Sequence, residues 1–582
     1  MKTIIQKSIF VIFILAAALA NAQQWGYYTL YAPSNSTTAY LIDTADSPVT
    51  FKTWTFSSSK KTGYSTYLVP GDTLVRSYGY TASGGLSGGG MTGAVQKVLW
   101  DNTVVWDYQY NSSTYSLHHD ICPMKNGNVL MIAYEVKSAT LATQAGASSA
   151  TSVWSEKIME VKPTGATTGT VVWEWKLWDH LCQNYNAAKD NYVTSIVNNP
   201  QLMNINIGTS QDRFHMNGID YNEALDQIVV SMHMTNEIYV IDHSTTTAVA
   251  ATHTGGNAGK GGDFLYRWGK PANYGATGTA IFNVVHDAHW VPSDNPNYPG
   301  YLCAFNNKGG TGSKSAFTIV NPPLSGYTYN LTLGQAYTPS TYNYQYTSAY
   351  TANDMGNSQQ LPNGNVLMCV PGMGSGAIFE VNAAGTTLWS KTATSPHAYR
   401  FTLCAVRGPV ASSSATSTVV CSGAQISLNS SALSVTETNP SYSYSWNSSP
   451  AGFTSSLQNP TLTAGAAGTY RYNVTITNSA LGCYDTASVL VTVNACTDVE
   501  LQNNKPQIEI FPNPTTGIVT INNGETNISD MQIVVSDVTG REIMKMRNTR
   551  TIDLSAFPDG IYFIAVLSGE NSPITRKIVL SR

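Results

Sequence analysis

The sequence predicts an all-β protein whose largest part is a β-propeller. The chain of 582 residues is long enough for several domains. Tyrosine, threonine, serine, asparagine and glycine are abundant, whereas charged residues make up 11% of the chain, a composition that favours strands over helices. Strand-turn-strand units also recur at intervals of tens of residues, as the blades of a propeller do.

The first residues have the pattern of a secretory signal peptide. Lys2 and Lys7 flank the start of an apolar run, and "ANA" ends the segment with small residues suited to cleavage after Ala22. The apolar run is shorter than a membrane-spanning helix requires. We therefore expect residues 1–22 to be removed and the mature chain to be exported without a transmembrane segment.

The propeller is predicted over residues 23–408 because one pattern returns four times. Each copy has a polar turn, often Asn-Gly-Asn, followed by an apolar strand, and most copies add a second strand. Small sheets of this kind bury their faces against their neighbours, so the array must close or be capped. The copies cover residues 122–176, 218–245, 289–307 and 359–392.

Three histidines occupy equivalent positions in these repeats. His119, His215 and His286 each stand six residues before the corresponding turn position, and Gly356 stands at the fourth such position. Equivalent positions of propeller blades point the same way, so we expect the three imidazoles to meet at one end of the central channel. In a regular strand only one of His118 and His119 could face inward.

The remaining histidines give little indication of a functional site. His289 should face away from His286 in a strand, so the pair is a poor metal chelate and we predict no metal there. His233, His243 and His253 are interpreted as capping or hydrogen-bonding residues.

Residues 409–496 are predicted to form an immunoglobulin-like β-sandwich. The segment is rich in serine and threonine and alternates apolar with polar residues. Trp446 lies between Cys421 and Cys483, an arrangement typical of a tryptophan packed near a disulfide, so these two cysteines are the expected bridge. Most of the five earlier cysteines lie in apolar runs and are expected to be buried free thiols.

A linker at 497–507 leads to a small β module at 508–582. The module resembles the C-terminal sorting domain of cargo for the type IX secretion system of Bacteroidetes, through "FPNPTTG", "DVTGREI", "LSAFPDGIYFIAV" and the closing "KIVLSR". The resemblance implies recognition by that secretion machinery and a secreted or cell-surface location. The net charge of −4 gives no electrostatic reason to expect nucleic acid or an anionic membrane as a partner.

The propeller region is similar to the arylsulfotransferase family. The resemblance rests on segments that recur in order: "GYYTLYAPSNSTTAYLIDT", "HHDICPMKNGNVL", "WEWKLWDHLCQNYN", "FHMNGIDYNEALDQIVVSMHMTNEIYVID" and "GGDFLYRWGKPANYGATGTAIFNVVHDAHWVP". It implies a six-bladed propeller that moves sulfate from an aryl sulfate to a phenol through a transiently sulfurylated histidine. No nucleotide sulfate donor and no cofactor are implied.

The resemblance also implies site residues. His215 and Asn217 match a His-x-Asn signature, His286 matches a second signature, and His119 and His180 match variants with "HHD" and "WDH". Where an arginine is expected the chain has two lysines, and a histidine and an arginine of the last blade are candidates to replace it. The predicted catalytic residues are His119, His215 and His286, and the predicted substrate-binding residues are Asn217, His180, Lys308, Lys314, His397 and Arg400.

Two functions remain open from the sequence. One is an exported sulfotransferase, which the number of channel histidines favours, since imidazole can serve both as nucleophile and as cation. The other is a non-catalytic surface propeller that binds sulfated or phenolic glycans, which the missing arginine favours. A serine-hydrolase site is not indicated, because the chain has no G-x-S-x-G motif.

Overall fold

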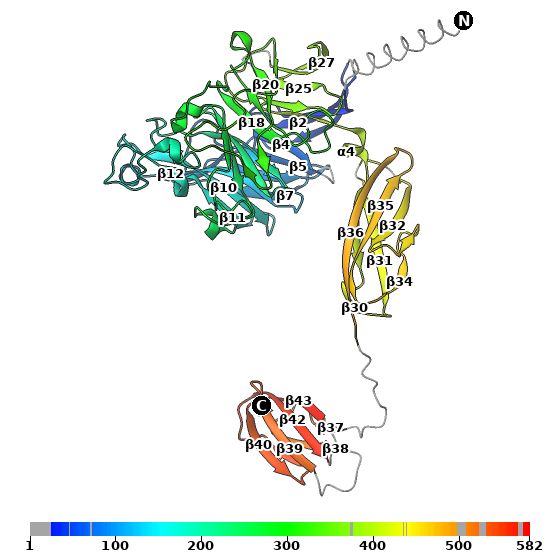
Figure 1. Cartoon of the computed structure of the whole chain (residues 1–582). Helices are drawn as coiled ribbons and strands as arrows, with labels where there is room; N and C mark the ends of the chain where they lie inside the picture. Colours follow the sequence, from blue (N-terminus) through cyan, green and yellow to red (C-terminus); the bar gives the residue numbers. More distant parts are fainter. Residues whose placement is uncertain are drawn as a thin grey trace, which may run out of the picture. The chain divides into compact units, whose positions relative to one another are not determined.

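The computed structural model describes residues 25–45, 47–69, 73–372, 376–434, 436–437, 439–496, 508–522, 531–568 and 574–582 (Figure 1). The predicted signal peptide and linker lie outside these residues. The chain divides into two compact units, one ending at Asn494 and the other beginning at Ala495. Strands make up most of the regular structure, which confirms the predicted all-β class.

Six four-stranded antiparallel sheets form the first part of the chain. The first three have the orders β28 (Ala398–Phe401), β1 (Tyr28–Tyr31), β2 (Thr38–Asp43), β3 (Thr50–Thr55); β4 (Thr62–Val69), β5 (Thr73–Gly79), β6 (Gly93–Val98), β7 (Val104–Gln109); and β8 (Tyr115–Pro123), β9 (Val129–Lys137), β10 (Val153–Pro163), β11 (Gly169–Lys176). The other three have the orders β14 (Met216–Asn222), β15 (Gln227–Met232), β16 (Glu237–Asp242), β17 (Tyr266–Trp268); β18 (Val285–Trp290), β19 (Leu302–Asn306), β20 (Ala316–Val320), β23 (Tyr344–Thr347); and β24 (Asn357–Gln360), β25 (Val366–Val370), β26 (Ala377–Val381), β27 (Thr387–Thr392).

The six sheets form a closed ring, which is the arrangement of a six-bladed propeller. The first strands of successive sheets, β4, β8, β14, β18, β24 and β28, lie against one another in that order. The ring closes where Tyr67 of β4 meets Tyr399 of β28, with 5.1 Å between ring centroids. The first sheet joins both ends of the region, because β1 pairs with β28. We call these six strands the inner strands.

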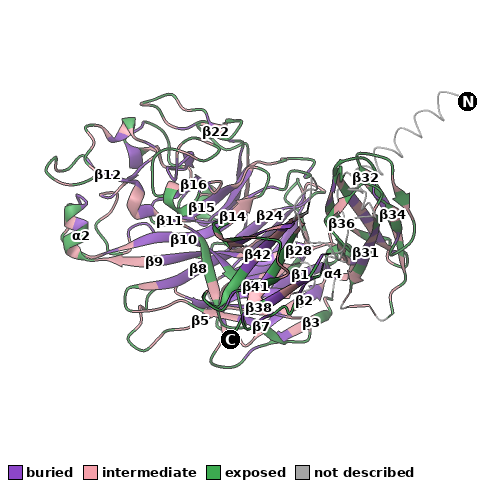
Figure 2. Ribbon diagram, turned by 90° about the horizontal axis from the view of Figure 1, so that it is seen from below, coloured by how far each residue is buried: buried purple, intermediate pink, exposed green. Residues whose placement is uncertain are grey.

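The blades are held together by apolar cores between the sheets. Strands β9, β10 and β14 are buried along most of their length, and Figure 2 shows them largely in purple. Asp120 also accepts a hydrogen bond from the backbone N–H of Ile219 (3.1 Å), and Asp287 accepts one from that of Ser358 (3.0 Å). Each bond joins one inner strand to the next, so the ring is tied by polar as well as apolar contacts.

Two further sheets follow in the first unit. One has the order β29 (Val410–Ala415), β31 (Gln425–Leu433), β34 (Thr461–Thr463), and the other β30 (Val419–Cys421), β36 (Cys483–Asn494), β35 (Gly468–Asn478), β32 (Tyr442–Ser449), β33 (Thr454–Ser455). Trp446 is buried in the core that both sheets share. The tryptophan thus lies where the sandwich pattern places it.

The expected bridge between Cys421 and Cys483 is wrong. Cys483 is bonded to Cys404 of helix α4 (Leu403–Arg407), and both Cys421 and Cys496 are also disulfide-bonded. Cys421 pairs in register with Asn494, at the opposite end of β36 from Cys483. A strand rises about 3.3 Å per residue, so the two expected partners are far beyond the separation of about 7 Å that a disulfide tolerates.

The second unit contains two small sheets that share one apolar core. One has the order β37 (Glu509–Phe511), β38 (Ile518–Asn522), β41 (Thr551–Asp553), and the other β40 (Glu542–Arg547), β39 (Met531–Asp537), β42 (Gly560–Ser568), β43 (Ile574–Leu580). Among the described residues of both units, no helix combines the length and the apolar character needed to cross a membrane.

Candidate functional site

Four imidazoles meet beside three neighbouring inner strands, β8, β14 and β18. His119 lies in β8, His215 directly precedes β14, His233 follows β15, and His286 lies in β18. Ring centroids are 4.6 Å apart between His119 and His215, 5.2 Å between His215 and His233, and 5.6 Å between His233 and His286. We call these four residues the histidine cluster. The three histidines predicted to converge therefore do lie together, and a fourth joins them.

Irregular backbone turns these side chains toward one another. The pairing of β8 with β9 shifts register between Leu117 and Ile121, and His119 has a left-handed φ of 47°. His215 has a φ of 57° at the corresponding place before β14. Left-handed backbone costs a non-glycine residue roughly 1–3 kcal/mol and is concentrated at functional sites. The bulge is also why both His118 and His119 face the same network, contrary to the strict alternation expected of a strand.

Gly90 makes the position of His119 possible. The backbone N–H of His119 donates to the Gly90 carbonyl (2.7 Å), which brings the imidazole over the glycine. A Cβ atom at Gly90 would lie 1.7 Å from the ring of His119, and Gly90 has a φ of +74°. Steric space and backbone conformation therefore both require glycine here.

A line of hydrogen-bonding groups runs through the site. Nδ1 of His215 donates to Oδ2 of Asp212 (2.5 Å), and Nε2 of His215 lies 3.2 Å from Nε2 of His119. Nδ1 of His119 lies 3.0 Å from Nδ1 of His118, whose Nε2 lies 3.1 Å from Oε2 of Glu156. Three imidazoles thus lie in a row between two carboxyl groups.

His215 is the imidazole of this row that favours the charged form. Burial lowers its pKa, but the hydrogen bond and the negative charge of Asp212 outweigh burial, and the pKa of His215 is raised above its ordinary value. With both nitrogens protonated, His215 donates to Asp212 through Nδ1 and to His119 through Nε2. His119 can then be neutral and donate through Nδ1 to Nδ1 of His118, whose Nε2 lies near Glu156 without forming a hydrogen bond.

The neighbouring imidazoles are held neutral at pH 7. Burial, together with the charge of nearby histidines, lowers their pKa values: to about 3 for His118, to about 4 for His233, and well below the ordinary value for His119 and His286. An imidazole whose pKa is raised therefore stands beside imidazoles whose pKa values are lowered, which suits an anionic substrate and a nucleophile.

The tautomer of His286 is fixed by Asn307. The amide Nδ2 of Asn307 donates to the backbone carbonyl of Met355 (2.8 Å), so its Oδ1 faces Nδ1 of His286 at 2.8 Å. An amide oxygen only accepts, so Nδ1 of His286 carries the proton and Nε2 carries the lone pair. That lone pair accepts a bond from the Met355 backbone N–H (3.1 Å).

Two of the predicted substrate-binding residues lie near the cluster. Asn217 donates through Nδ2 to the Val285 carbonyl (2.8 Å) and accepts from Ser231, so it links β14 to β18 beneath the histidines. The charge of Lys308 adds to burial and to His215 in lowering the pKa of His233. Lys314, by contrast, is exposed in the short turn that precedes β20.

The last blade contributes one residue to the channel. His397 lies 6.5 Å from Tyr67 between ring centroids, and its charge opposes the burial that raises the pKa of Asp120 to about 6. Arg400 of β28 forms a buried ion pair with Glu380 of β26 in the neighbouring blade (2.7 Å), so its charge is already paired.

His180 is built into a different group of side chains. It ends the short 3-10 helix η1 (Leu177–His180), where its Nδ1 lies 2.8 Å from Oδ1 of Asp263. It is therefore not brought to the histidine cluster.

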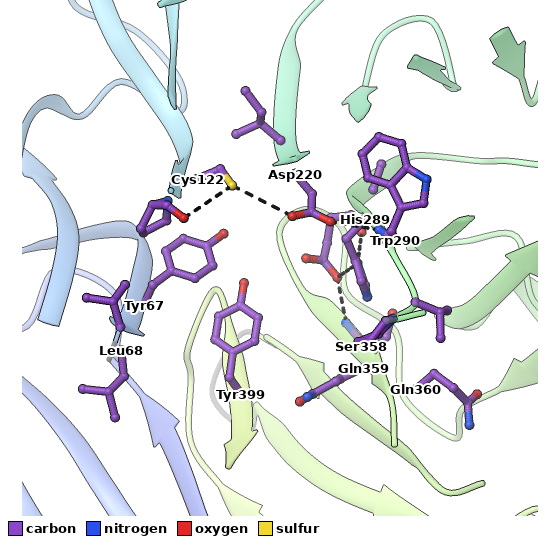
Figure 3. A pocket seen from close by; sticks show the side chains of 17 residues that line it. Tyr67, Leu68, Cys122, Asp220, His289, Trp290, Ser358, Gln359, Gln360 and Tyr399 are labelled. Carbon is purple, nitrogen blue, oxygen red and sulfur yellow. Dashed lines mark hydrogen bonds and ion pairs between the residues drawn. The ribbon is translucent and has the colours of Figure 1, made fainter. Parts of the chain in front are cut away.

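A cavity of about 320 Å³ lies at the far ends of the inner strands. Figure 3 shows the hydroxyl groups of Tyr67 and Tyr399 pointing into it. His289 lines this cavity and contacts the thiol of Cys303 (Nε2 to Sγ, 3.0 Å). His286 lies in the histidine cluster and His289 lines the cavity, so the two side chains face different places, as the sequence predicted.

Sequence reasoning missed His233 and Asp212. Because β15 runs antiparallel to β14, its end returns to the beginning of β14, where the His233 N–H donates to the His215 carbonyl (2.9 Å). A histidine at the hairpin position opposite a predicted site residue was the available signal. No sequence signal pointed to Asp212, because it lies in an irregular loop before β14.

Two parts of the chain match known families. Residues 103–377 match the model of the arylsulfotransferase (ASST) family, and residues 509–581 match the model of the secretion system C-terminal sorting domain. Both predicted resemblances are confirmed. The first supports a sulfotransferase role in broad terms, and the second supports export to the cell surface or beyond through the secretion machinery. No curated protein matches the sequence.

Solved structures give weaker likenesses. The periplasmic gluconolactonase of Pseudomonas aeruginosa has 10% identity and a TM-score of 0.34, covering 63% of this chain and 96% of its own. A protein from Lactobacillus plantarum has 10% identity and a TM-score of 0.29, covering 81% and 97%. Fibronectin(III)-like modules of Clostridium thermocellum CbhA have 14% identity and a TM-score of 0.14, covering 29% and 93%. At these TM-scores the likenesses carry no argument.

Proposed function

Because residues 103–377 match the model of the arylsulfotransferase family, we propose that the protein moves a sulfuryl group from an aryl sulfate to a phenolic acceptor through a sulfohistidine, without a nucleotide sulfate donor. The observation that supports this best is the meeting of four imidazoles in the histidine cluster, one with a raised pKa and the others with lowered pKa values. Sulfuryl transfer needs a nucleophile and a positively charged donor around a tetrahedral anion.

His286 is the nucleophile in this proposal. It is neutral, and Asn307 fixes the tautomer that places the lone pair on Nε2. Nε2 exchanges its bond to the Met355 N–H for sulfur, the sulfur–oxygen bond of the donor breaks, and the aryl oxide leaves with the electron pair. Nδ1 keeps its proton throughout, so the sulfurylated ring carries a positive charge that balances the sulfonate.

His215 is the acid and then the base. Its imidazolium attracts the sulfate monoester and gives its proton to the departing aryl oxide, which leaves as a phenol. In the second half-reaction neutral His215 takes the proton of the acceptor phenol, whose oxygen attacks sulfur and releases neutral His286. His119, hydrogen-bonded to Nε2 of His215 (3.2 Å), orients that ring.

The proposed location of the protein is the cell surface or the exterior of the cell. The predicted signal peptide at residues 1–22 would direct the chain out of the cytoplasm, and the sorting domain at 509–581 would direct it across an outer membrane of the Bacteroidetes type.

A non-catalytic propeller that binds sulfated or phenolic glycans is the second candidate. One observation favours it: Arg400, the arginine considered for gripping sulfate, is locked to Glu380. Lysine or histidine can neutralise a sulfate but lacks the planar fork of arginine.

The test is a donor–acceptor assay with 4-nitrophenyl sulfate and phenol, with mass spectrometry of the quenched enzyme. We expect nitrophenolate release and a sulfuryl adduct on the peptide of His286, both lost in His286→Ala and both retained in His289→Ala. Release no greater than that of His286→Ala would overturn catalysis. Thermal stabilisation by the ester without turnover would support the binding protein instead.

A further inference from the structure

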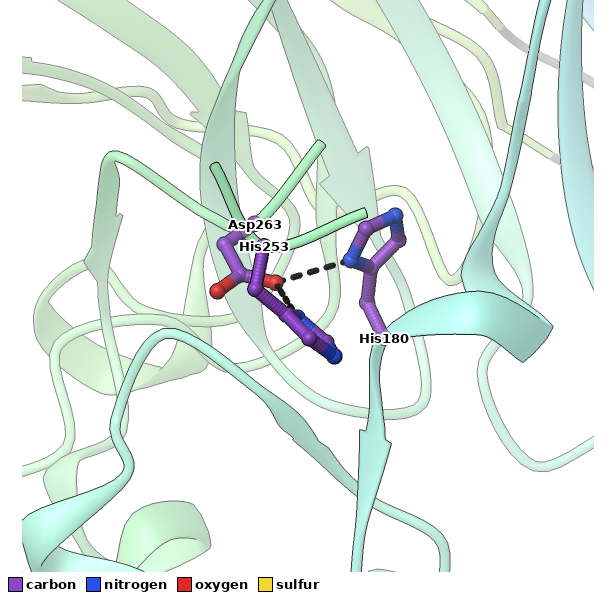
Figure 4. Close-up of side chains that lie close together, drawn as sticks. All are labelled: His180, His253 and Asp263. Carbon is purple, nitrogen blue, oxygen red and sulfur yellow. Dashed lines mark hydrogen bonds and ion pairs between the residues drawn. The ribbon is translucent and has the colours of Figure 1, made fainter. Parts of the chain in front are cut away.

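A second group of imidazole and carboxylate side chains is built from other parts of the chain (Figure 4). His180 ends η1, and His253 and Asp263 lie in the loop between β16 and β17. Oδ1 of Asp263 lies 2.8 Å from Nδ1 of His180 and 2.7 Å from Nδ1 of His253. The three ligand atoms all lie within 4.8 Å of one another.

The hydrogen-bonding capacity of His180 calls for a cation between these groups. Its Nε2 lies 2.8 Å from the carbonyl oxygen of Ala250, which only accepts, so Nε2 carries a proton. A neutral imidazole then has a lone pair on Nδ1, facing a carboxylate oxygen that also only accepts. Either a second proton or a metal ion must lie between Nδ1 of His180 and Asp263.

The surroundings fix the His180 ring before any ion binds. Trp175 stacks on it with 5.6 Å between centroids and 2° between planes, and the indole N–H donates to the Gly262 carbonyl (2.7 Å). A Cβ atom at Gly262 would lie 2.0 Å from the Ala250 carbonyl oxygen and 2.6 Å from Nε2 of His180. The loop can approach the ring this closely only with glycine at position 262.

We propose that His180, His253 and Asp263 bind one Zn²⁺ ion, with water as the fourth ligand. Zinc prefers imidazole nitrogen with carboxylate oxygen, whereas calcium and magnesium prefer oxygen alone. The bond from Nε2 of His180 to a backbone carbonyl is the outer contact that zinc-bound histidines usually make. The ion ties the β16–β17 loop to η1 of the preceding blade, a role independent of the proposed sulfotransferase chemistry.

The geometry requires two small movements. Zinc–ligand bonds of about 2.0–2.1 Å place tetrahedral ligand atoms about 3.3 Å apart, somewhat more than the two distances to Asp263. The side chain of His253 is 59% exposed, so it can withdraw by this amount without disturbing packed residues, and the Asp263 carboxylate must turn slightly away from His180. The exposure of His253 also gives the ion an entry path and leaves room for the water.

The experiment is a Zn²⁺ titration of the full chain after removal of metal with a chelator. Calorimetry gives the affinity, elemental analysis gives the number of ions, and Co²⁺ substitution reports tetrahedral geometry through its visible absorption. We expect one site that is weakened at least tenfold in His253→Ala and in Asp263→Asn. The matched control is Lys260→Ala, an exchange in the same loop that should leave binding unchanged.

A second control separates this site from the histidine cluster, whose imidazoles could also hold zinc. His233→Ala should keep the one-ion stoichiometry and the Zn²⁺-dependent rise in Tm, and His253→Ala should lose both. Equal binding in His253→Ala and the unmodified chain would overturn the proposal, and so would loss of the ion in His233→Ala. Thermal unfolding of His253→Ala without metal should match that of the unmodified chain, because the side chain is exposed.

Discussion

Asp212 lies with its Oδ2 atom 2.5 Å from Nδ1 of His215, and this contact determines the charge of the histidine cluster. Without it, burial would lower the pKa of His215 as it lowers those of His119 and His286. The side chain of Asp212 is 22% exposed, so the pair stands at the rim of the site. A carboxylate there raises the pKa of one imidazole while burial lowers the pKa values of its neighbours.

Asp212→Asn should therefore change the pH dependence of activity. His215 would lose its proton below its ordinary pKa of about 6.5, whereas in the unmodified enzyme it keeps the proton to higher pH. We expect kcat/KM for 4-nitrophenyl sulfate to fall roughly 100-fold at pH 7 and to recover partly toward pH 5.5.

The measurement is kcat/KM from pH 5 to pH 9. Asp354→Asn is the control, because Asp354 acts on His233 by its charge alone. Parallel pH profiles for Asp212→Asn and the unmodified enzyme would contradict the assigned role of Asp212.

Gly90→Ala should displace the His119 ring. The new methyl group would occupy the position of the imidazole, and the left-handed φ adds strain of roughly 1–2 kcal/mol. We expect a loss of activity and a lower Tm. Gly89→Ala is the matched control, since a Cβ atom there has no heavy atom within 4 Å. Equal activity of the two variants would show that His119 need not lie over Gly90.

The propeller and most of the histidine cluster could be predicted because both follow from repetition. Blades of similar sequence place equivalent residues at the same end of a ring, so His119, His215 and His286 could be brought together without coordinates. The same reasoning separated His289 from His286. These predictions depend on topology, which can be inferred from the spacing of the turns along the chain.

The rest of the site depends on departures from regular structure. The bulge in β8 allows His118 and His119 to share one network, whereas alternation along a regular strand separates them. His233 enters through a hairpin contact and Asp212 through an irregular loop. Local irregularity and loop geometry arise from tertiary packing, which a single sequence does not reveal. The disulfide of Cys404 also depends on tertiary packing, because Cys404 lies in α4 and its partner Cys483 begins β36.

The disulfide between Cys404 and Cys483 should stabilise the first unit. It joins residues 79 positions apart, and a bond that closes so long a loop contributes about 2–4 kcal/mol. We expect the double variant Cys404→Ser, Cys483→Ser to unfold at lower urea concentration, with activity preserved below its transition. The control is Cys122→Ser, which removes a free thiol. Mapping of non-reduced peptides should recover the Cys404–Cys483 pair. A Cys421–Cys483 peptide would contradict the structure.

His243 should make stability depend on pH in the alkaline range. Its Nδ1 lies 2.7 Å from Asp226 and its Nε2 lies 3.0 Å from Glu160, so both nitrogens face acceptors. Burial lowers the pKa of His243, but the two carboxylates outweigh it and raise the pKa to about 9.

Because the folded pKa exceeds the unfolded value, the contribution of His243 is complete below about pH 6.5 and is lost as pH rises toward 9. With allowance for the partly exposed Asp226, we expect roughly 1–3 kcal/mol. The free energy of unfolding should therefore differ between the unmodified chain and His243→Gln at pH 6, and the difference should shrink by pH 9. Urea titrations at pH 6, 7.5 and 9 measure this difference. The contributions of the other titrating groups are common to both chains and cancel in it. A difference that stays constant over this range would mean that His243 is not held as a cation between its two carboxylates.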